Sequence, residues 1–332
     1  MRTTNYPLVS IVTPSYNQAR YLEYTIQSVL RQDYPHIEYL IVDGGSTDDS
    51  VDIIKKYAPR LSWWTSQPDS GQAEAINKGL SRARGEILAW LNSDDMYLPG
   101  VLSQAVKAFE SYPQASMVYG DAITVDEVGH LLNALVFGDW GLKELMAFRI
   151  ICQPAVFMRR TALDQAGLLD ESYHCLLDHH LWVRLAILAP IQHISAFWAA
   201  ARFHPAAKNV AQASLFGQEA LRLASWMGDQ PELAHLLSEN LRQVWGGAHR
   251  LNARYLLDGG KAGPALLAYG KALRENPKFA FQHWHRMLFA LVAWLGGGRI
   301  ARQLAKRYLD SPPPLTCQHP EWKNWPGLCL EA

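Results

Sequence analysis

Cysteine is scarce in this chain, and its few copies are poorly placed for a structural role. Cys152, Cys175, Cys317 and Cys329 form no Cys-x-x-Cys pair and no cysteine–histidine spacing of the kind that binds zinc. A disulfide framework needs a denser and more regular pattern than this one. We therefore predict free thiols in a reducing compartment.

An excess of charge of one sign is also absent, because 31 Lys and Arg side chains are balanced by 31 Asp and Glu side chains. Proteins that bind nucleic acids usually carry a strongly basic balance, so we expect no nucleic-acid partner. The N-terminus lacks the apolar stretch of a signal peptide. The late apolar run at 287–295 is too short to span a bilayer. We expect a cytoplasmic chain, either soluble or bound peripherally at the inner face of the membrane.

Two nucleotide-binding motifs are missing. The chain contains neither G-x-G-x-x-G nor G-x-x-x-x-G-K-[ST], so a dinucleotide-dependent dehydrogenase and a P-loop NTPase are poorly supported. What the chain does contain is 49% hydrophobic residues over 332 positions. That content is sufficient for one large domain or two smaller ones.

Strand and helix patterns alternate through roughly the first 130 residues. The strands are short runs rich in β-branched residues, and the helices are amphipathic. This alternation predicts a parallel sheet covered by helices on both faces, which binds ligands at the carboxyl ends of its strands. The predicted strands are 8–14, 37–43, 61–66, 85–91 and 115–125, and the predicted helices are 20–32, 50–58, 71–83 and 98–111.

Further along, the pattern becomes less regular. A strand is predicted at 154–160 and an amphipathic helix at 176–189. From residue 213 to the end the pattern is almost entirely helical. We therefore divide the chain into an α/β domain at 1–212 and a helical C-terminal extension at 213–332.

Polar residues, together with Pro14 and Gly71, lie at the end of each of the first four predicted strands or shortly after it. Because the carboxyl ends of parallel strands meet at one edge, we expect these residues to line a single ligand cleft. They are Pro14, Tyr16 and Asn17 after the first strand, Asp43 after the second, Asp69 and Gly71 after the third, and Asn92, Asp94 and Asp95 after the fourth.

The adjacent carboxylates of Asp94 and Asp95 would repel one another at a strand tip unless they were neutralised. Mg²⁺ or Mn²⁺ suits such hard oxygen ligands and takes phosphate oxygens as further ligands, so the pair indicates a metal bound to a diphosphate. The alternative is a cap for the following helix. Asp43 and Asp69 can accept hydrogen bonds from a nucleobase or a ribose, or can simply close turns, and Gly71 allows the backbone to approach a ligand.

Taken together, these segments resemble family 2 glycosyltransferases with the GT-A fold. The resemblance rests on "VSIVTPSYNQARYLEYTIQSVLRQDYPHIEYLIVDGGSTDDS", "PDSGQAEAINKG" and "GEILAWLNSDD", and continues more weakly through "CQPAVFMRR", "LLDHHLWVRL" and "ARFHPAAKN". It implies a Rossmann-like mixed sheet. It also implies inverting transfer of a sugar from a nucleotide-diphosphate donor to a glycan or lipid-linked acceptor in surface polysaccharide or glycan biosynthesis. The default donor is a uridine diphosphate sugar, and thymidine and guanosine diphosphate sugars are the alternatives.

The resemblance also implies roles for individual residues, listed here by role. Pro14, Tyr16, Asn17, Asp43, Asp69, Gly71, Asn92 and Asp94 would hold the donor nucleotide; Asp94, Asp95 and His204 would bind Mg²⁺ or Mn²⁺; Asp178 would be the catalytic base; and Gln153 and Pro154 would lie on the acceptor side. The alternatives are a helix cap for Asp178 and an ordinary loop histidine for His204.

The chain departs from the family pattern at two positions. Asn92 stands where the first acid of the metal motif often lies, and Leu177 replaces a glutamate that usually precedes the base. Because of these departures, a non-catalytic nucleotide-sugar-binding or scaffolding protein remains an alternative. A nucleotidyltransferase is disfavoured, because the segment "IVTPSYNQARYL" is not a glycine-rich basic loop.

The C-terminal region is basic, with about a dozen Lys and Arg against about three Asp and Glu between residues 241 and 310. The segment 279–308 joins an apolar stretch to Arg299, Arg302, Lys306 and Arg307. Such helices can lie on an anionic membrane surface, so we expect peripheral membrane contact there. Ordinary helical packing with a solvated basic face is the alternative.

Overall fold

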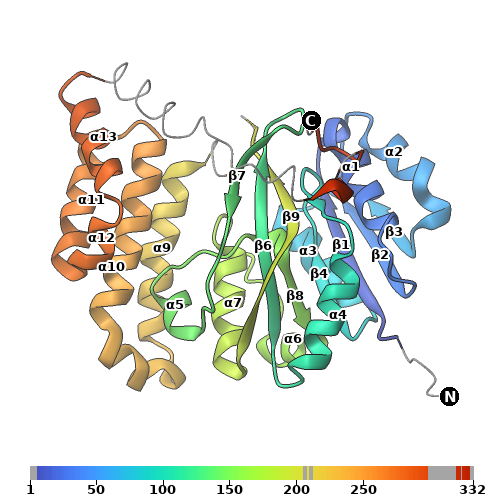
Figure 1. The fold of residues 1–332 in the computed structure, drawn as a ribbon, viewed down its shortest axis with the longest axis horizontal. Coiled ribbons are helices and arrows are strands. Elements are labelled where there is room, and N and C mark those ends of the chain that lie inside the picture. The colour runs from blue at the N-terminus through green and yellow to red at the C-terminus, as the bar shows by residue number, and fades with distance from the viewer. Residues whose placement is uncertain (1–5, 205–207, 209–211, 298–318, 323, 330–332) are drawn as a thin grey trace.

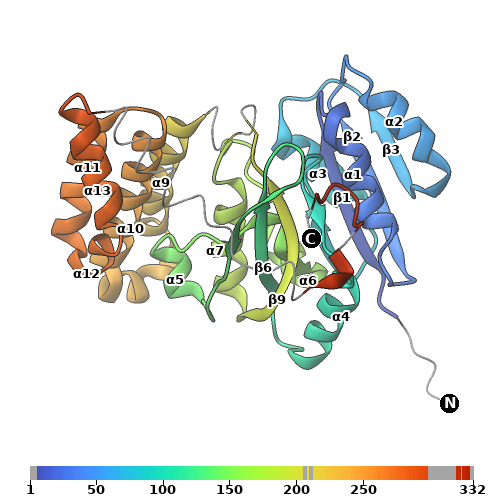
Figure 2. The same ribbon diagram turned by 45° about the horizontal axis from the view of Figure 1, so that its top comes forward.

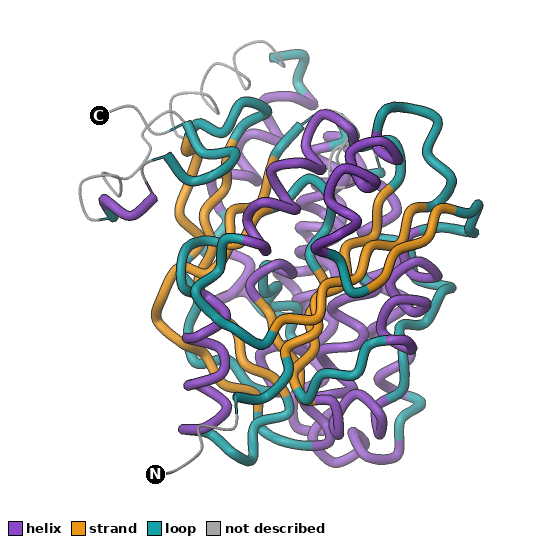
Figure 3. Tube along the Cα trace, turned by 90° about the vertical axis from the view of Figure 1, so that its right-hand side faces the viewer, coloured by secondary structure: helices purple, strands orange, loops and turns teal. Residues whose placement is uncertain are grey.

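The structure, a computed structural model, describes residues 6–204, 208, 212–297, 319–322 and 324–329. Within these residues a nine-stranded sheet runs through the molecule with helices on both faces (Figure 1). Figure 3 views the molecule from the side and shows the strongly twisted strands between layers of helices. Cys152, Cys175 and Cys329 are free thiols as predicted, and Cys317 lies outside the described residues.

The N-terminal half of the sheet is parallel, in the order β3–β2–β1–β4. Every residue of β1 and β4 is buried, as their sequences, rich in apolar and β-branched residues, predict. The predicted alternation of strands and helices is confirmed here. The elements are β1 (Val9–Ser15), α1 (Ala19–Leu30), β2 (Ile37–Asp43), α2 (Ser50–Tyr57), β3 (Trp63–Ser66), α3 (Gln72–Arg82), β4 (Ile87–Trp90) and α4 (Val101–Ser111).

Beyond β4 the sheet becomes mixed, as the family resemblance implies. The strand β8 (Val156–Arg159) enters antiparallel between β4 and β6 (Met117–Val125), so the all-parallel order expected from the alternation alone stops there. The strand β9 (Ile191–Arg202) runs parallel to β6. Two short strands complete the sheet, β5 (Met96–Tyr97) beside β9 and β7 (Leu131–Leu135) beside β6. The helices of this part are α5 (Leu142–Met146), α6 (Arg160–Ala166) and α7 (Leu177–Leu188).

The C-terminal helices gather at one end of the molecule (Figures 1 and 2). They share a hydrophobic core with the sheet: Leu223 and Leu251 belong to the same buried cluster as Trp90 and Trp182. In the part of the chain that the structure describes, no helix combines the length and the apolar character needed to cross a membrane. The helices are α9 (Ala213–Gly228), α10 (Ala234–Asp258), α11 (Ala262–Glu275), α12 (Pro277–Phe281) and α13 (Trp284–Trp294).

Candidate active site

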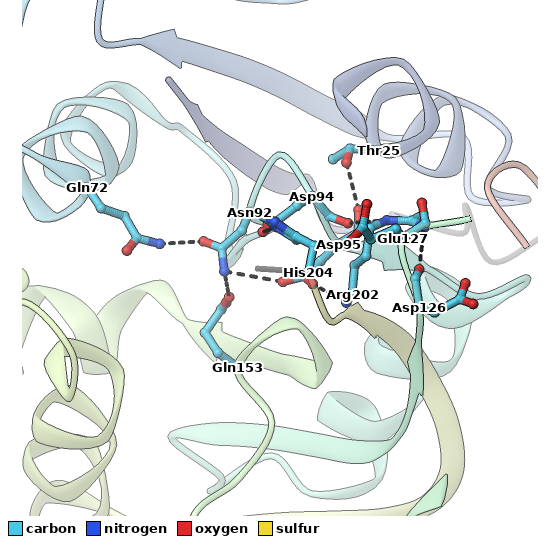
Figure 4. A network of polar contacts seen from close by, with 10 residues as sticks. All are labelled: Thr25, Gln72, Asn92, Asp94, Asp95, Asp126, Glu127, Gln153, Arg202 and His204. Atoms are coloured by element: carbon cyan, nitrogen blue, oxygen red, sulfur yellow. Dashed lines mark hydrogen bonds and ion pairs between the residues drawn. The ribbon is translucent and has the colours of Figure 1, made fainter. Parts of the chain in front are cut away.

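The two carboxylates that follow β4 have different surroundings (Figure 4). The Asp95 side chain is buried; its Oδ1 accepts a hydrogen bond from the Arg202 backbone N–H at 3.0 Å, and its Oδ2 accepts one from Asn92 Nδ2 at 3.3 Å. Burial and the neighbouring Asp94 carboxylate raise the pKa of Asp95 well above its usual range, against the opposing effect of these hydrogen bonds. Both oxygens of Asp95 are therefore engaged by protein groups.

Asp94 instead turns its carboxylate toward His204, which follows β9. The distance from His204 Nε2 to Asp94 Oδ2 is 2.9 Å, and the Asp94 side chain is 20% exposed. The imidazole is buried, and its ring centroid lies 4.9 Å from that of Tyr21. A carboxylate oxygen and an imidazole nitrogen thus meet at the edge of the sheet with access to solvent.

This pair is the part of the site that fits a divalent cation. No group of three or more His, Cys, Asp or Glu side chains among the described residues is arranged to hold a metal ion. Mg²⁺ and Mn²⁺ sites for nucleotides need fewer protein ligands, since waters and phosphate oxygens complete the coordination. The donor set of Asp94 and His204 therefore suits an ion that is bound together with a diphosphate.

Arg202 braces the main chain around the Asp94–His204 pair. Its guanidinium, which is buried, donates from Nε to the Asp94 carbonyl at 3.1 Å and from Nη1 to the Asp126 carbonyl at 2.9 Å. These bonds join the tip of β4 to the turn between β6 and β7. Sequence reasoning did not single out Arg202, although it stands two positions before His204 in a quoted segment.

Asn92 connects the tip of β4 to two neighbouring segments (Figure 4). Its Oδ1 accepts a hydrogen bond from Gln72 Nε2 at 2.7 Å, and its Nδ2 donates to Gln153 Oε1 at 3.1 Å. Gln153 in turn donates from Nε2 to the Trp90 carbonyl at 2.8 Å. The predicted acceptor-side residue Gln153 therefore belongs to this network, and Pro154 is buried beside it.

Asp43 and Asp69 stand together at the ends of β2 and β3. Asp43 is fully buried, and its Oδ2 accepts hydrogen bonds from Ser46 N–H at 2.9 Å and Ser66 Oγ at 2.7 Å. A Cβ atom on Gly44 would lie 2.7 Å from Asp69 Oδ2, so the Asp69 carboxylate is packed directly against the backbone there. Burial is the largest cause that raises the pKa of Asp69.

The remaining predicted nucleotide residues have mixed surroundings. Pro14 is buried within β1, opposite Val42 of β2, whereas Tyr16 is 61% exposed at the edge of the sheet. Asn17 has a positive φ of 51°, and its Oδ1 accepts the Thr47 N–H at 2.8 Å. Gly71, with φ 137° and ψ −177°, adopts a backbone conformation that is essentially restricted to glycine.

Asp178 lies in the first turn of α7. Its Oδ1 accepts a hydrogen bond from the following N–H, that of His179, at 2.7 Å. Burial is the main reason that its pKa rises to about 6, and Glu219 contributes in the same direction while Lys208 opposes it. A carboxylate with this pKa is ionised at neutral pH and basic enough to take a proton from a hydroxyl in a transition state.

Lys208 links the residues around Asn92 to the loop that precedes Asp178. Its Nζ donates to Gln72 Oε1 at 2.7 Å and to the His174 carbonyl at 3.0 Å, and thereby connects the Asn92 network to the loop that leads into α7. Sequence reasoning did not identify Lys208. A small pocket opens here; its lining is Ser70, Gly71, Gln72, Ala73, Glu74, Glu171, Tyr173, His174, Leu177 and Lys208.

The mixed sheet, the acidic tip of β4 and the carboxylate at the start of α7 form the arrangement that the resemblance to GT-A glycosyltransferases implies. Residues 10–140 match the model of the family described as Glycosyl transferase family 2. An uncharacterized glycosyltransferase of Mycobacterium tuberculosis is 38% identical over 188 residues, which cover 56% of this chain and 71% of that protein. The chain belongs to glycosyl transferase family 2.

Other relatives are matched over smaller shares of their length. A Rickettsia felis protein named as an uncharacterized glycosyltransferase is 27% identical over 208 residues, 60% of this chain, which spans only 34% of that relative. The putative teichuronic acid biosynthesis glycosyltransferase TuaG of Bacillus subtilis is 38% identical over 143 residues, 40% of this chain and 56% of that protein. Relatives of this chain thus include a protein named for polysaccharide biosynthesis.

Solved structures share the fold over most of the chain. Residues 1–349 of Staphylococcus aureus TarS in complex with UDP-GlcNAc match with a TM-score of 0.57 and 17% identity, covering 91% of each chain. The mannosyltransferase PcManGT of Pyrobaculum calidifontis, in complex with GDP-Man and Mn²⁺, matches with a TM-score of 0.56 and 21% identity, covering 87% of this chain and 86% of that one. At these identities the likeness establishes a common GT-A fold.

Proposed function

We propose that this chain transfers a sugar from a nucleotide-diphosphate donor to an acceptor hydroxyl, with inversion at the anomeric carbon, in surface polysaccharide or glycan biosynthesis. The observation that carries the proposal is the meeting of Asp94 and His204 at 2.9 Å at the carboxyl edge of the sheet. Structures of the same fold were determined with UDP-GlcNAc and with GDP-Man, which supports a nucleotide-sugar donor. A uridine diphosphate sugar is the default donor.

The proposed reaction is a single displacement with Asp178 as the general base. Asp178 takes the proton of the acceptor hydroxyl while the acceptor oxygen forms a bond to the anomeric carbon of the sugar. The bond from that carbon to the diphosphate oxygen breaks, and its electron pair leaves with the nucleoside diphosphate. Attack and departure occur on opposite faces of the carbon, so the configuration inverts.

We further propose that Asp94 and His204 would hold Mg²⁺ or Mn²⁺. The ion would stabilise the negative charge of the departing diphosphate. Asp95, which the family resemblance implies as a further ligand, is proposed instead to fix the loop that presents Asp94, because its oxygens accept hydrogen bonds from Arg202 and Asn92.

Release of nucleoside diphosphate from a panel of nucleotide sugars tests this function. Wild type, Asp94→Ala and Asp178→Asn are compared, each with and without a glycan or lipid-linked acceptor. We expect one donor to be consumed, chelation and Asp94→Ala to abolish its consumption, and Asp178→Asn to retain donor binding. If a donor binds but none is turned over, even with acceptors present, the scaffolding alternative is favoured. If no donor binds, the proposal is wrong.

We propose that the chain meets its acceptor at a membrane surface. It would bind this surface through an apolar face on α12 and α13. Trp284, Leu288 and Leu291 recur at helical spacing along α13, Leu295 continues this spacing at its C-cap, and Phe281 ends α12. Each of these residues is at least 42% exposed. Between residues 241 and 297 the chain has eight Lys or Arg and two Asp or Glu. An apolar helical face with tryptophan in a basic region complements an anionic bilayer. Arg299, Arg302, Lys306 and Arg307, on which this expectation also drew, lie outside the described residues.

Vesicle co-sedimentation tests the membrane contact. We expect the full chain to bind vesicles that contain phosphatidylglycerol and to bind neutral phosphatidylcholine vesicles more weakly. A Trp284→Ser, Leu288→Ser double variant should lose at least about tenfold in affinity, since each buried side chain contributes about 1.5–3 kcal/mol. Leu132→Ser, at a 41% exposed position on β7, is the control. Self-association of the chain through this face, without vesicle binding, would contradict the assignment.

A further inference from the structure

One buried carboxylate, that of Glu219, links the C-terminal helices to the loop that precedes the candidate base Asp178. Glu219 lies in α9 and is only 4% exposed. It accepts three backbone hydrogen bonds from consecutive residues of the loop before α7: His174 N–H at 2.7 Å, Cys175 N–H at 2.8 Å and Leu176 N–H at 2.7 Å. These donors lie 43 to 45 residues before Glu219 in the chain.

The loop that Glu219 holds leads directly to Asp178. Leu176 is the N-cap residue of α7, and Asp178 lies two positions further on, in the first turn of that helix. Hydrogen bonds to an ionised group are stronger than those between neutral groups, so three of them fix the loop firmly. The main chain of His174 is held from both sides, because Lys208 donates to its carbonyl while Glu219 accepts from its N–H.

We infer that Glu219 is a positioning residue for the transfer reaction, which fixes the start of α7 so that Asp178 meets the acceptor hydroxyl in one orientation. The assignment rests on the proposed function, in which Asp178 is the base. It goes beyond that function because Glu219 lies in α9, one of the C-terminal helices, to which the proposed function gives no part in the transfer step. The C-terminal helices therefore contribute to the site as well as to the core.

Glu219 also acts on Asp178 through its charge. Burial is the largest cause of the raised pKa of Asp178, and Glu219 adds to it. Among the described residues, the titratable groups that also interact electrostatically with Asp178 include Lys208, Cys175 in the preceding loop, Cys152 and Tyr255 of α10. Removal of the Glu219 charge makes Asp178 easier to ionise. Asp178 then remains ionised, and able to act as the base, at lower pH. The acid limb of the pH profile of kcat therefore moves to lower pH.

The test compares Glu219→Gln, Glu219→Asp and the control Glu239→Gln, which removes a charge at an exposed position of α10. Hydrogen exchange at residues 174–176 and the pH dependence of kcat are measured on the full chain. For Glu219→Gln we expect exchange to accelerate at least about tenfold. We also expect kcat to fall about 10- to 100-fold with the donor KM nearly unchanged, because the base is misplaced. The acid limb should move to lower pH, and Glu239→Gln should match wild type.

Glu219→Asp keeps the charge and shortens the side chain, so kcat should fall while the acid limb stays in place. It also decides the matter if Glu219→Gln does not fold. If a folded Glu219→Gln protein has the same exchange rates and the same kcat as wild type, the inference is wrong. A lower kcat with an unmoved acid limb and unchanged exchange at 174–176 overturns it as well, because the effect is then merely structural. If wild type transfers no sugar, the proposed function has failed, and the exchange measurement still decides whether Glu219 holds the loop.

Discussion

The imidazole of His204 and the carboxylate of Asp94 meet at 2.9 Å although 110 residues separate them in the chain. The sheet brings them together: Asp94 follows β4, His204 follows β9, and the backbone N–H of Arg202 at the end of β9 binds the adjacent Asp95. The buried Arg202 guanidinium also binds the Asp94 carbonyl. The position of this pair is thus set by two hydrogen bonds in which a buried side chain at the end of one strand binds the main chain at the end of the other.

Substitution of His204 should weaken metal binding more than donor binding. In His204→Ala one of the two proposed protein ligands is lost, so we expect the apparent affinity for Mn²⁺ to fall at least about 10- to 100-fold. Titration of Mn²⁺ against donor turnover measures the change. His235→Ala, which alters a histidine that is 88% exposed on α10, should leave the titration unchanged. An unaltered Mn²⁺ requirement in His204→Ala would place the metal elsewhere.

Asp178→Asn should make the protein more stable and less active. The pKa of Asp178 is raised to about 6 in the folded protein. Ionised Asp178 therefore costs stability above that pH, and the cost disappears as the pH falls through about 6 toward the unfolded-state pKa near 4. We expect Asn to add about 1–2 kcal/mol at pH 8 and almost nothing at pH 4.

Urea unfolding at both pH values measures that difference. Turnover should fall about 10²- to 10⁴-fold in the same variant, since a positioned base contributes that much. Asp229→Asn, at an exposed position after α9, is the control for the loss of one charge. A variant that is less stable than wild type at pH 8 would show that the Asp178 carboxylate is stabilising, which contradicts the burial argument.

Gly71 should not tolerate a side chain, although there is space for one. No heavy atom lies within 4 Å of a Cβ built there, so the obstacle is the backbone conformation at φ 137°. We expect Gly71→Ala to cost about 1–3 kcal/mol or to shift the loop that carries Asp69. Gly270 in α11 also has open space, but it lies within a helix, so Gly270→Ala should stabilise by about 0.5–1 kcal/mol. Thermal unfolding of both variants and their donor affinity distinguish the two effects.

Much of the N-terminal half could be predicted from the sequence, because its signals are local. The strands β1, β2 and β4 are short runs rich in apolar and β-branched residues, each followed by polar residues that the parallel order brings to one edge. The antiparallel direction of β8 could not be predicted from the local sequence, since a buried strand has the same composition in either direction. The long strand β9 shifts register against β6 near Asp121, and this irregularity hides its period.

The residues that sequence reasoning missed act over long distances in the chain. Glu219 is one charged residue in an amphipathic helix, a pattern that ordinarily indicates a solvated face, and its partners lie more than 40 residues away. Lys208 likewise binds Gln72 across 136 residues. Such contacts depend on how helices pack onto the sheet, and no short sequence motif predicts that packing.

The shared core predicts that the chain unfolds as one unit. Leu223 of α9 is fully buried in the cluster that also contains Trp90 and Trp182, so its truncation leaves a cavity next to the sheet. We expect Leu223→Ala to cost about 2–5 kcal/mol and to lower the midpoint of a single transition.

Leu267→Ala, at a position that is 74% exposed on α11, should change stability by no more than about 0.5 kcal/mol. Tryptophan fluorescence and far-ultraviolet circular dichroism are recorded during the same urea titration. The fluorescence reports on both parts of the chain, because Trp90 and Trp182 lie in the α/β part and Trp226 lies in α9, whereas far-ultraviolet circular dichroism follows mainly the helices. Coincident transitions that shift together in Leu223→Ala would establish one cooperative unit. Two separated transitions, with only the helical one shifted, would show that α9–α13 fold independently of the α/β part.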